Sequence, residues 1–78
     1  MAHSFKRKIK TLKSILEKYR KYIPKCENIE CFVDGENIII KLKKKNAEYH
    51  NVTIKAPTTD IDVLISRYRA ILYQKENV

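Results

Sequence analysis

Residues 28–44, NIECFVDGENIIIKLKK, decide the fold, because two β-rich runs flank the tetrapeptide DGEN. The dipeptide Asp34-Gly35 is a strong short-range signal for a β-hairpin. Residues 51–56, NVTIKA, then alternate between apolar and polar side chains, as a half-buried strand does. We therefore predict three antiparallel strands, with residues 46–51 as the loop between the second and the third.

The N-terminal segment has the spacing of an amphipathic helix. Its apolar residues recur at intervals of four and three, at Phe5, Ile9, Leu12, Leu16, Tyr19 and Ile23, with Ile15 and Tyr22 widening the stripe. Ser4 suits the N-cap position. Pro24 is expected to stop the helix at about Ile23, because a residue before proline avoids the helical conformation.

Residues 57–75, PTTDIDVLISRYRAILYQK, are predicted to form the closing helix. Thr59 and Asp62 have the spacing of a capping box, so we expect Asp60 and Asp62 to cap this helix rather than to bind a metal. The apolar stripe comprises Ile61, Leu64, Ile65, Tyr68, Ile71 and Leu72. Each helix has one apolar stripe, so both should cover the same face of the sheet.

The predicted fold class is therefore α+β, with the order α-β-β-β-α. Two helices pack on one face of a three-stranded antiparallel sheet, in a single small basic domain that spans residues 1–78. The second strand should be central, and the other face of the sheet should stay open.

Charge is distributed unevenly along the chain, whose formal net charge is +8. Residues 1–25 hold nine Lys and Arg against one acid, Glu17, whereas eight basic residues meet eight acidic ones from residue 26 onward. Such asymmetry favours nucleic acid or an anionic membrane as the partner. The apolar face of the first helix is needed for the core, so we expect no membrane partner.

Five cations of the N-terminal segment lie near the pole of the helical wheel opposite its apolar stripe. They are Arg7, Lys10, Lys18, Lys21 and Lys25. The row would be roughly 27 Å long at about 1.5 Å per residue. A merely solvated helix face usually mixes signs. We therefore expect this row to contact phosphates, with a solvated face as the alternative.

The open face of the sheet should carry a second basic surface. If Ile38, Ile40 and Leu42 point at the helices, alternation sends Ile39, Lys41 and Lys43 to the open face. Lysine beside an exposed aromatic suits RNA, through phosphate contact and base stacking. The alternative is that these lysines only solubilise the sheet and discourage edge pairing. The candidate RNA-binding residues here are Phe32, Lys41, Lys43 and Lys55, with Lys44, Lys45 and Tyr49 in the following loop.

Residues 28–74 resemble the Alu-domain-binding subunits of the signal recognition particle. The resemblance rests on VDGENIIIKLKKK at residues 33–45 and NVTIKAPTTDIDVLISRYRAILY at residues 51–73. It implies a small basic α-β-β-β-α protomer that pairs with another protomer and binds RNA on its exposed sheet. A second resemblance, of VDGENIIIKLK and the closing helix, is to the small dimerising subunit of the KEOPS tRNA-modification complex.

Catalytic and metal-binding patterns are not recognisable in the sequence. Cys26 and Cys31 are the only cysteines, and His3 and His50 lack the spacing of zinc ligands. We find no nucleophile–base pair and no glycine-rich phosphate loop. We therefore expect no enzymatic activity, no cofactor, no metal and no small-molecule substrate, and reduced thiols with Cys31 in the core.

The function predicted from these patterns is that of an RNA-binding structural component of a ribonucleoprotein particle, such as the ribosome or a signal-recognition-like particle. We expect a cytoplasmic protein that contacts ribosomal or other structured RNA and forms a homo- or heterodimer or a larger complex. The alternative is a non-enzymatic protein-interaction or dimerisation subunit of a complex such as a tRNA-modification assembly. DNA stays open as the ligand, because phosphate contacts do not discriminate.

Overall fold

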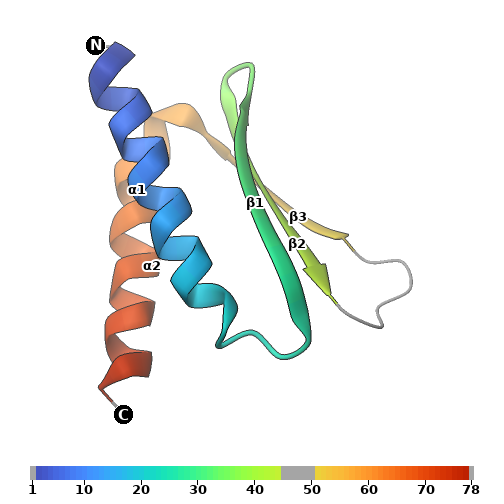
Figure 1. The fold of residues 1–78 in the computed structure, drawn as a ribbon. Coiled ribbons are helices and arrows are strands. Elements are labelled where there is room, and N and C mark those ends of the chain that lie inside the picture. The colour runs from blue at the N-terminus through green and yellow to red at the C-terminus, as the bar shows by residue number, and fades with distance from the viewer. Residues whose placement is uncertain (1, 45–50, 78) are drawn as a thin grey trace.

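The computed structural model describes residues 2–44 and 51–77. Its elements are α1 (Ala2–Arg20), β1 (Cys26–Asp34), β2 (Asn37–Lys44), β3 (Asn51–Pro57), the 3-10 turn η1 (Thr58–Asp60) and α2 (Ile61–Glu76). The predicted fold class is confirmed: the order is α-β-β-β-α, and the two helices pack together and on β1 (Figure 1).

The sheet is antiparallel with the order β1-β2-β3, so β2 is the central strand as predicted. Ile40 of β2 lies opposite Cys31 of β1 and Ile54 of β3, and all three belong to the side of the sheet that the helices cover. The turn between β1 and β2 contains Gly35 at a φ of 62°. Glycine is favoured there because this left-handed conformation strains residues that carry a Cβ.

The core lies between the helices and the covered face of the sheet. Leu12 and Leu16 of α1 and Ile38 and Ile40 of β2 are its largest fully buried side chains. Burying each such side chain contributes about 1.5–3 kcal/mol relative to leaving it exposed. The helical spacing of the leucines and the strand alternation of the isoleucines thus specify the two surfaces that meet.

Helices α1 and α2 run side by side in the same direction, and both begin at the end of the domain where β1 turns into β2 (Figure 1). The Lys8 ammonium pairs with the Asp62 carboxylate at 3.1 Å and joins the second turn of α1 to the first turn of α2. Further along, the rings of Tyr19 and Tyr68 pack edge to face with centroids 5.6 Å apart.

Two predictions about helix starts are wrong. Helix α1 already includes Ala2, so Ser4 lies inside the helix rather than at its N-cap. At α2 the N-cap residue is Asp60, and no side chain makes a capping hydrogen bond. The Asp62 carboxylate is bound to Lys8 instead, a partner 54 positions away that local spacing does not reveal.

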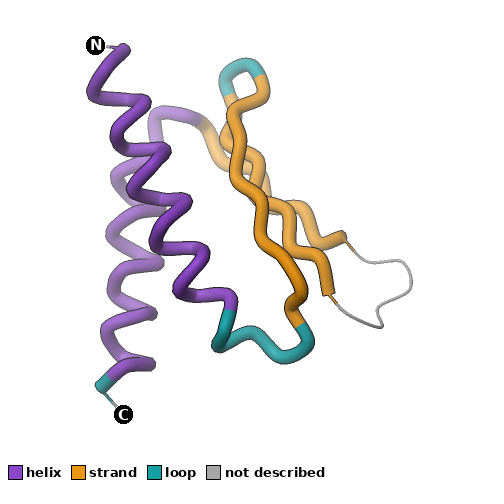
Figure 2. Tube along the Cα trace, viewed as in Figure 1, coloured by secondary structure: helices purple, strands orange, loops and turns teal. Residues whose placement is uncertain are grey.

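Helix α1 also ends earlier than predicted, at Arg20 rather than at Ile23. The chain tightens beyond that point, because the Tyr22 and Ile23 amides donate to carbonyls three residues earlier, those of Tyr19 and Arg20. Such bonds are common where a helix unwinds. Residues 21–25 form the connection to β1, which Figure 2 shows at the opposite end of the sheet from the β1–β2 turn. Within the described residues, no helix is both long and apolar enough to cross a bilayer.

Candidate nucleic-acid interface

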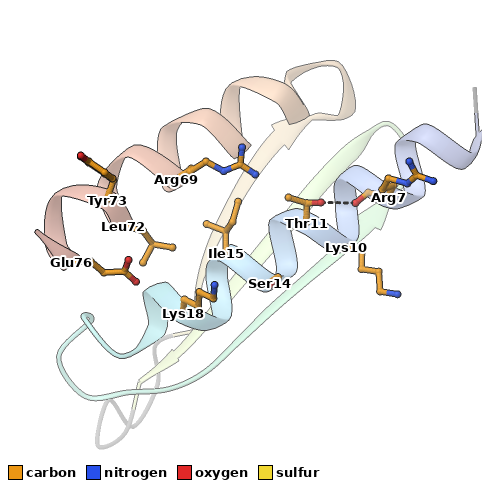
Figure 3. A pocket seen from close by; sticks show the side chains of 10 residues that line it. All are labelled: Arg7, Lys10, Thr11, Ser14, Ile15, Lys18, Arg69, Leu72, Tyr73 and Glu76. Carbon is orange, nitrogen blue, oxygen red and sulfur yellow. Dashed lines mark hydrogen bonds between the residues drawn. The ribbon is translucent and has the colours of Figure 1, made fainter.

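A groove of about 580 Å³ lies between α1 and α2. Figure 3 looks into this groove with the strands behind the helices, so it opens on the side of the helix pair that faces away from the sheet. Its lining residues are Arg7, Lys10, Thr11, Ser14, Ile15 and Lys18 of α1 and Arg69, Leu72, Tyr73 and Glu76 of α2. Three of the five predicted helix-row cations therefore border one concave surface.

The floor and the rims of the groove differ in character. Ile15 and Leu72 are buried, outside the cluster of residues packed against the sheet, and they form an apolar base between the helices. Arg69 extends from α2 toward α1, and the Lys18 side chain extends from α1 toward α2 (Figure 3). Tyr73 lies at the edge, with 69% of its surface exposed.

The other two cations of the predicted row are not on the helix. Lys21 and Lys25 lie in the connection between α1 and β1, because the helix ends at Arg20. The Lys21 ammonium lies 5.1 Å from the centroid of the Tyr22 ring, a cation–π distance. Lys25 adopts a φ of 61°. The continuous row of five cations predicted for one helix face is therefore wrong, although all five side chains are exposed or near the surface.

On the open face of the sheet, Lys41, Lys43 and Lys55 are exposed, as alternation predicted. The Lys41 ammonium lies 5.4 Å from the centroid of the Phe32 ring. Phe32 is 37% exposed and lies in the same cross-strand row as Lys55, with Ile39 between them. An exposed aromatic ring thus shares this face with three lysines, one of which, Lys41, lies over the ring. A base that stacks on that side of the ring must displace the Lys41 ammonium.

The exposure of Ile39 on this face differs from the sequence-based prediction. We expected it to be exposed, but only 4% of its surface is accessible. It lies in the central strand between Phe32 and Lys55. Side chains directly opposite each other across strands are about 4.5–5.5 Å apart at Cβ, so these two neighbours can cover it. The predicted alternation of side chains in β2 is therefore correct, but Ile39 is buried by neighbouring side chains of the sheet itself.

Lys44 is also placed differently from our prediction. It is the last residue of β2 rather than the first of a loop, and alternation puts it on the side of Leu42, which packs toward the core. It is half-buried and does not belong to the open face. Lys45 and Tyr49, the other two residues predicted for this loop, lie outside the described residues.

A shallow hollow of about 220 Å³ lies between β1 and β2 on the open face. It is lined by Asn28, Glu30, Lys41 and Lys43. The Asn28 amide can both donate and accept hydrogen bonds, and the Glu30 carboxylate accepts them, so the pair can bind the polar edge of a base. The adjacent ammonium groups suit phosphate.

Cys31 is a core residue, as predicted. Its side chain is buried and belongs to the cluster packed between the helices and the sheet. Burial raises the pKa of the Cys31 thiol, and the nearby Lys13 charge opposes this shift in part. A thiol that stays protonated is a poor nucleophile and a poor metal ligand. Within residues 2–44 and 51–77, no three His, Cys, Asp or Glu side chains are grouped as metal ligands.

Sequence reasoning missed the α2 side of the groove and the amide in the sheet hollow. Arg69 and Tyr73 flank the apolar stripe of α2, and the sequence offers no sign that they face α1. Asn28 is polar in a β-rich run, which is a weak signal. Comparisons with protein families, with curated proteins and with solved structures give no match.

Proposed function

We propose that this protein is an RNA-binding structural component of a ribonucleoprotein particle. The observation that carries the proposal is the open face of the sheet, where Lys41, Lys43 and Lys55 are exposed and the Lys41 ammonium lies over the exposed ring of Phe32. Phosphates bind ammonium groups and unpaired bases stack on aromatic rings, so the face offers both kinds of contact that RNA uses.

The charges of the described residues support an anionic ligand. Ion pairs occur at Lys8 with Asp62 and at Arg20 with Glu17, and neither involves a cation of the groove or of the open sheet face. Mutual repulsion among these free cations works against the folded state. Phosphates would relieve that repulsion and release counterions at the same time.

The two basic surfaces lie on opposite sides of the domain, because the helices cover one face of the sheet and the groove opens beyond them (Figures 1 and 3). A single straight duplex does not reach both. A folded RNA that touches the protein on two sides does, and this geometry favours a structural place within a particle over a role on isolated duplexes.

The second candidate function is that of a protein-interaction subunit, and the edge of the sheet at β3 favours it. Strand β3 lies at the border of the sheet, and Val52 on its helix-facing side is 40% exposed. An edge strand offers unpaired backbone groups to another chain. The two functions are compatible, since a protomer of a ribonucleoprotein complex needs protein contacts as well.

The test is to sequence the RNA that co-purifies with the tagged protein from the cells that make it. We expect one structured RNA to dominate, and we expect its recovery to fall sharply in the double variant Lys41→Gln/Lys43→Gln. The matched control is Arg67→Gln/Lys75→Gln, which removes the same charge from exposed positions of α2 that line neither the groove nor the sheet hollow. An RNA profile no different from that of an untagged strain would refute RNA binding. Loss of equal size in both variants would refute the sheet face as the contact.

A further inference from the structure

We infer that the groove between α1 and α2 binds a single-stranded segment of RNA, with Arg69 and Tyr73 of α2 as binding residues beside Arg7, Lys10 and Lys18 of α1. This inference rests on the proposed function and deepens it by naming a second surface and the form of RNA that the surface takes. Neither α2 residue belongs to the basic row expected from the sequence.

The groove between α1 and α2 is positively charged. Four cations line the groove, namely Arg7, Lys10, Lys18 and Arg69, and Glu76 is the one acid among its lining residues. None of the four is paired with a described carboxylate. The concave surface therefore carries an excess of positive charge, which suits an anion with several charges along its length.

The groove is elongated, and its cations are spread along its length. Arg7 and Lys18 are eleven positions apart on a continuous helix, which is about 16 Å at 1.5 Å per residue. The cations thus follow a line rather than a point, as the phosphates of a nucleic-acid strand do. Arg69 lies on the opposite helix and extends toward that line (Figure 3). The strand would run along the groove with phosphates reached from both helices.

The apolar part of the groove favours single-stranded RNA over an RNA duplex. The floor of Ile15 and Leu72 and the exposed ring of Tyr73 can contact base faces only where the bases are unpaired and unstacked. A duplex hides those faces and presents only its backbone. The Ser14 hydroxyl can donate to a phosphate oxygen, whereas the Thr11 hydroxyl already donates to the Arg7 carbonyl at 3.0 Å and can only accept, as from a ribose 2′-hydroxyl.

The experiment measures binding of a fluorescent oligouridine of about 12 nucleotides, within the usual site size for single strands, and of an RNA duplex of equal length. The groove variant is Lys18→Gln/Arg69→Gln, and the control is again Arg67→Gln/Lys75→Gln. All four positions are exposed, so thermal unfolding should be little changed in both proteins. We expect the groove variant to bind oligouridine about tenfold more weakly and the control to bind it nearly as the wild type does.

Two further readouts separate stacking from charge. In the groove variant, the slope of log K against log salt should become less steep by about 1.4, which is about 0.7 for each lost phosphate contact on a single strand. Tyr73→Leu should weaken oligouridine binding about fivefold or more while leaving the slope unchanged, because base stacking is not a charge contact. Duplex binding should not change with Tyr73→Leu, because the stacked bases of a duplex cannot pack on the ring.

The experiment distinguishes failure of the groove inference from failure of the proposed function. If the groove variant binds oligouridine like the control while Lys41→Gln/Lys43→Gln loses RNA, the inference is overturned and the proposed function stands. If the wild type binds no RNA at low salt, both are overturned. If the groove variant keeps RNA but loses binding of an oligoglutamate peptide, the groove is a docking surface for an acidic protein segment, and the inference is again overturned.

Discussion

At the scale of single residues, the backbone of the described part of the chain has two positions of positive φ, one suited to its residue and one not. Gly35 has a φ of 62° in the β1–β2 turn, and Lys25 has a φ of 61° before β1. The left-handed conformation disfavours a residue with a Cβ by about 1–2 kcal/mol. Lys25 is therefore strained where Gly35 is relaxed, although their φ angles are nearly the same.

We predict that Lys25→Gly raises the free energy of unfolding by about 0.5–1 kcal/mol. The gain is smaller than the strain itself, because glycine also loses more conformational freedom on folding. Urea unfolding followed by circular dichroism measures the change. Lys25→Ala, which removes the charge but keeps the Cβ, should give no such gain.

Gly35→Ala provides the opposite change. No atom lies within 4 Å of the position that a Cβ would take, so any loss is conformational rather than steric. We expect a loss of about 1 kcal/mol in the free energy of unfolding.

A Lys25→Gly protein that is no more stable than Lys25→Ala would show that residue 25 is unstrained in solution.

Residue-level inference from the sequence succeeds where a residue's surroundings are local. Alternation places Cys31 in the core and Lys41 on the open face, because neighbouring strands repeat the same pattern. It fails for Ile39, whose burial depends on which side chains lie opposite it in the other two strands. It also fails for Asp62, whose partner Lys8 is distant in sequence.

At the scale of elements, the sheet is covered unevenly. The β1 residues Ile29 and Cys31 are buried beneath the helices, whereas on β3 Ile54 and Ala56 are half-buried and Val52 is exposed. Strand β3 is therefore an edge in two respects, with unpaired backbone groups and with incompletely covered side chains. Another chain that extended the sheet at β3 would remove both deficits.

We therefore predict that the protein associates through β3, as a homodimer when no other partner is present. Sedimentation equilibrium at micromolar concentration should give a mass near twice that of the chain. Val52→Lys should shift the equilibrium to monomer, because it places a charge in the proposed contact. The matched control is Val33→Lys on β1, a valine of nearly equal exposure (41%), which should leave the dimer intact. A folded wild-type monomer would contradict the prediction, and so would equal dissociation in both variants.

Element types and their order follow from the sequence because hairpin, strand and helix signals are all local. Element ends follow less well. The end of α1 at Arg20 depends on how the chain turns back to the sheet, where the Arg20 guanidinium donates to the Glu27 carbonyl at 3.0 Å. That contact joins a helix to the following strand, and no helical periodicity encodes it.

At the scale of the whole molecule, the domain is a flat body with principal extents of 40 × 32 × 15 Å. Basic surfaces lie on its two broad sides, and a small core holds them apart. Such a body gains stability from partners that bind only the folded form.

The groove is the part of the candidate interface that the sequence could not predict. The cations Arg7, Lys10 and Lys18 are recognisable as one face of a helix, but their meeting with Arg69 and Tyr73 depends on the relative placement of α1 and α2. Both helices have a single apolar stripe in the sequence. The buried pair of Ile15 and Leu72 between the helices shows that each stripe serves two neighbours, the sheet and the other helix.

If this protein binds RNA through its exposed cations, as we propose, its affinity must fall steeply as the salt concentration rises. The wild-type protein should be titrated with the RNA that co-purifies with it, at several salt concentrations. If about seven contacts form in the groove and on the open sheet face, log K should fall linearly with log salt with a slope of about −5. A slope near zero at measurable affinity would contradict the account, because the contact would then be apolar and the cations would be no more than a solvated surface.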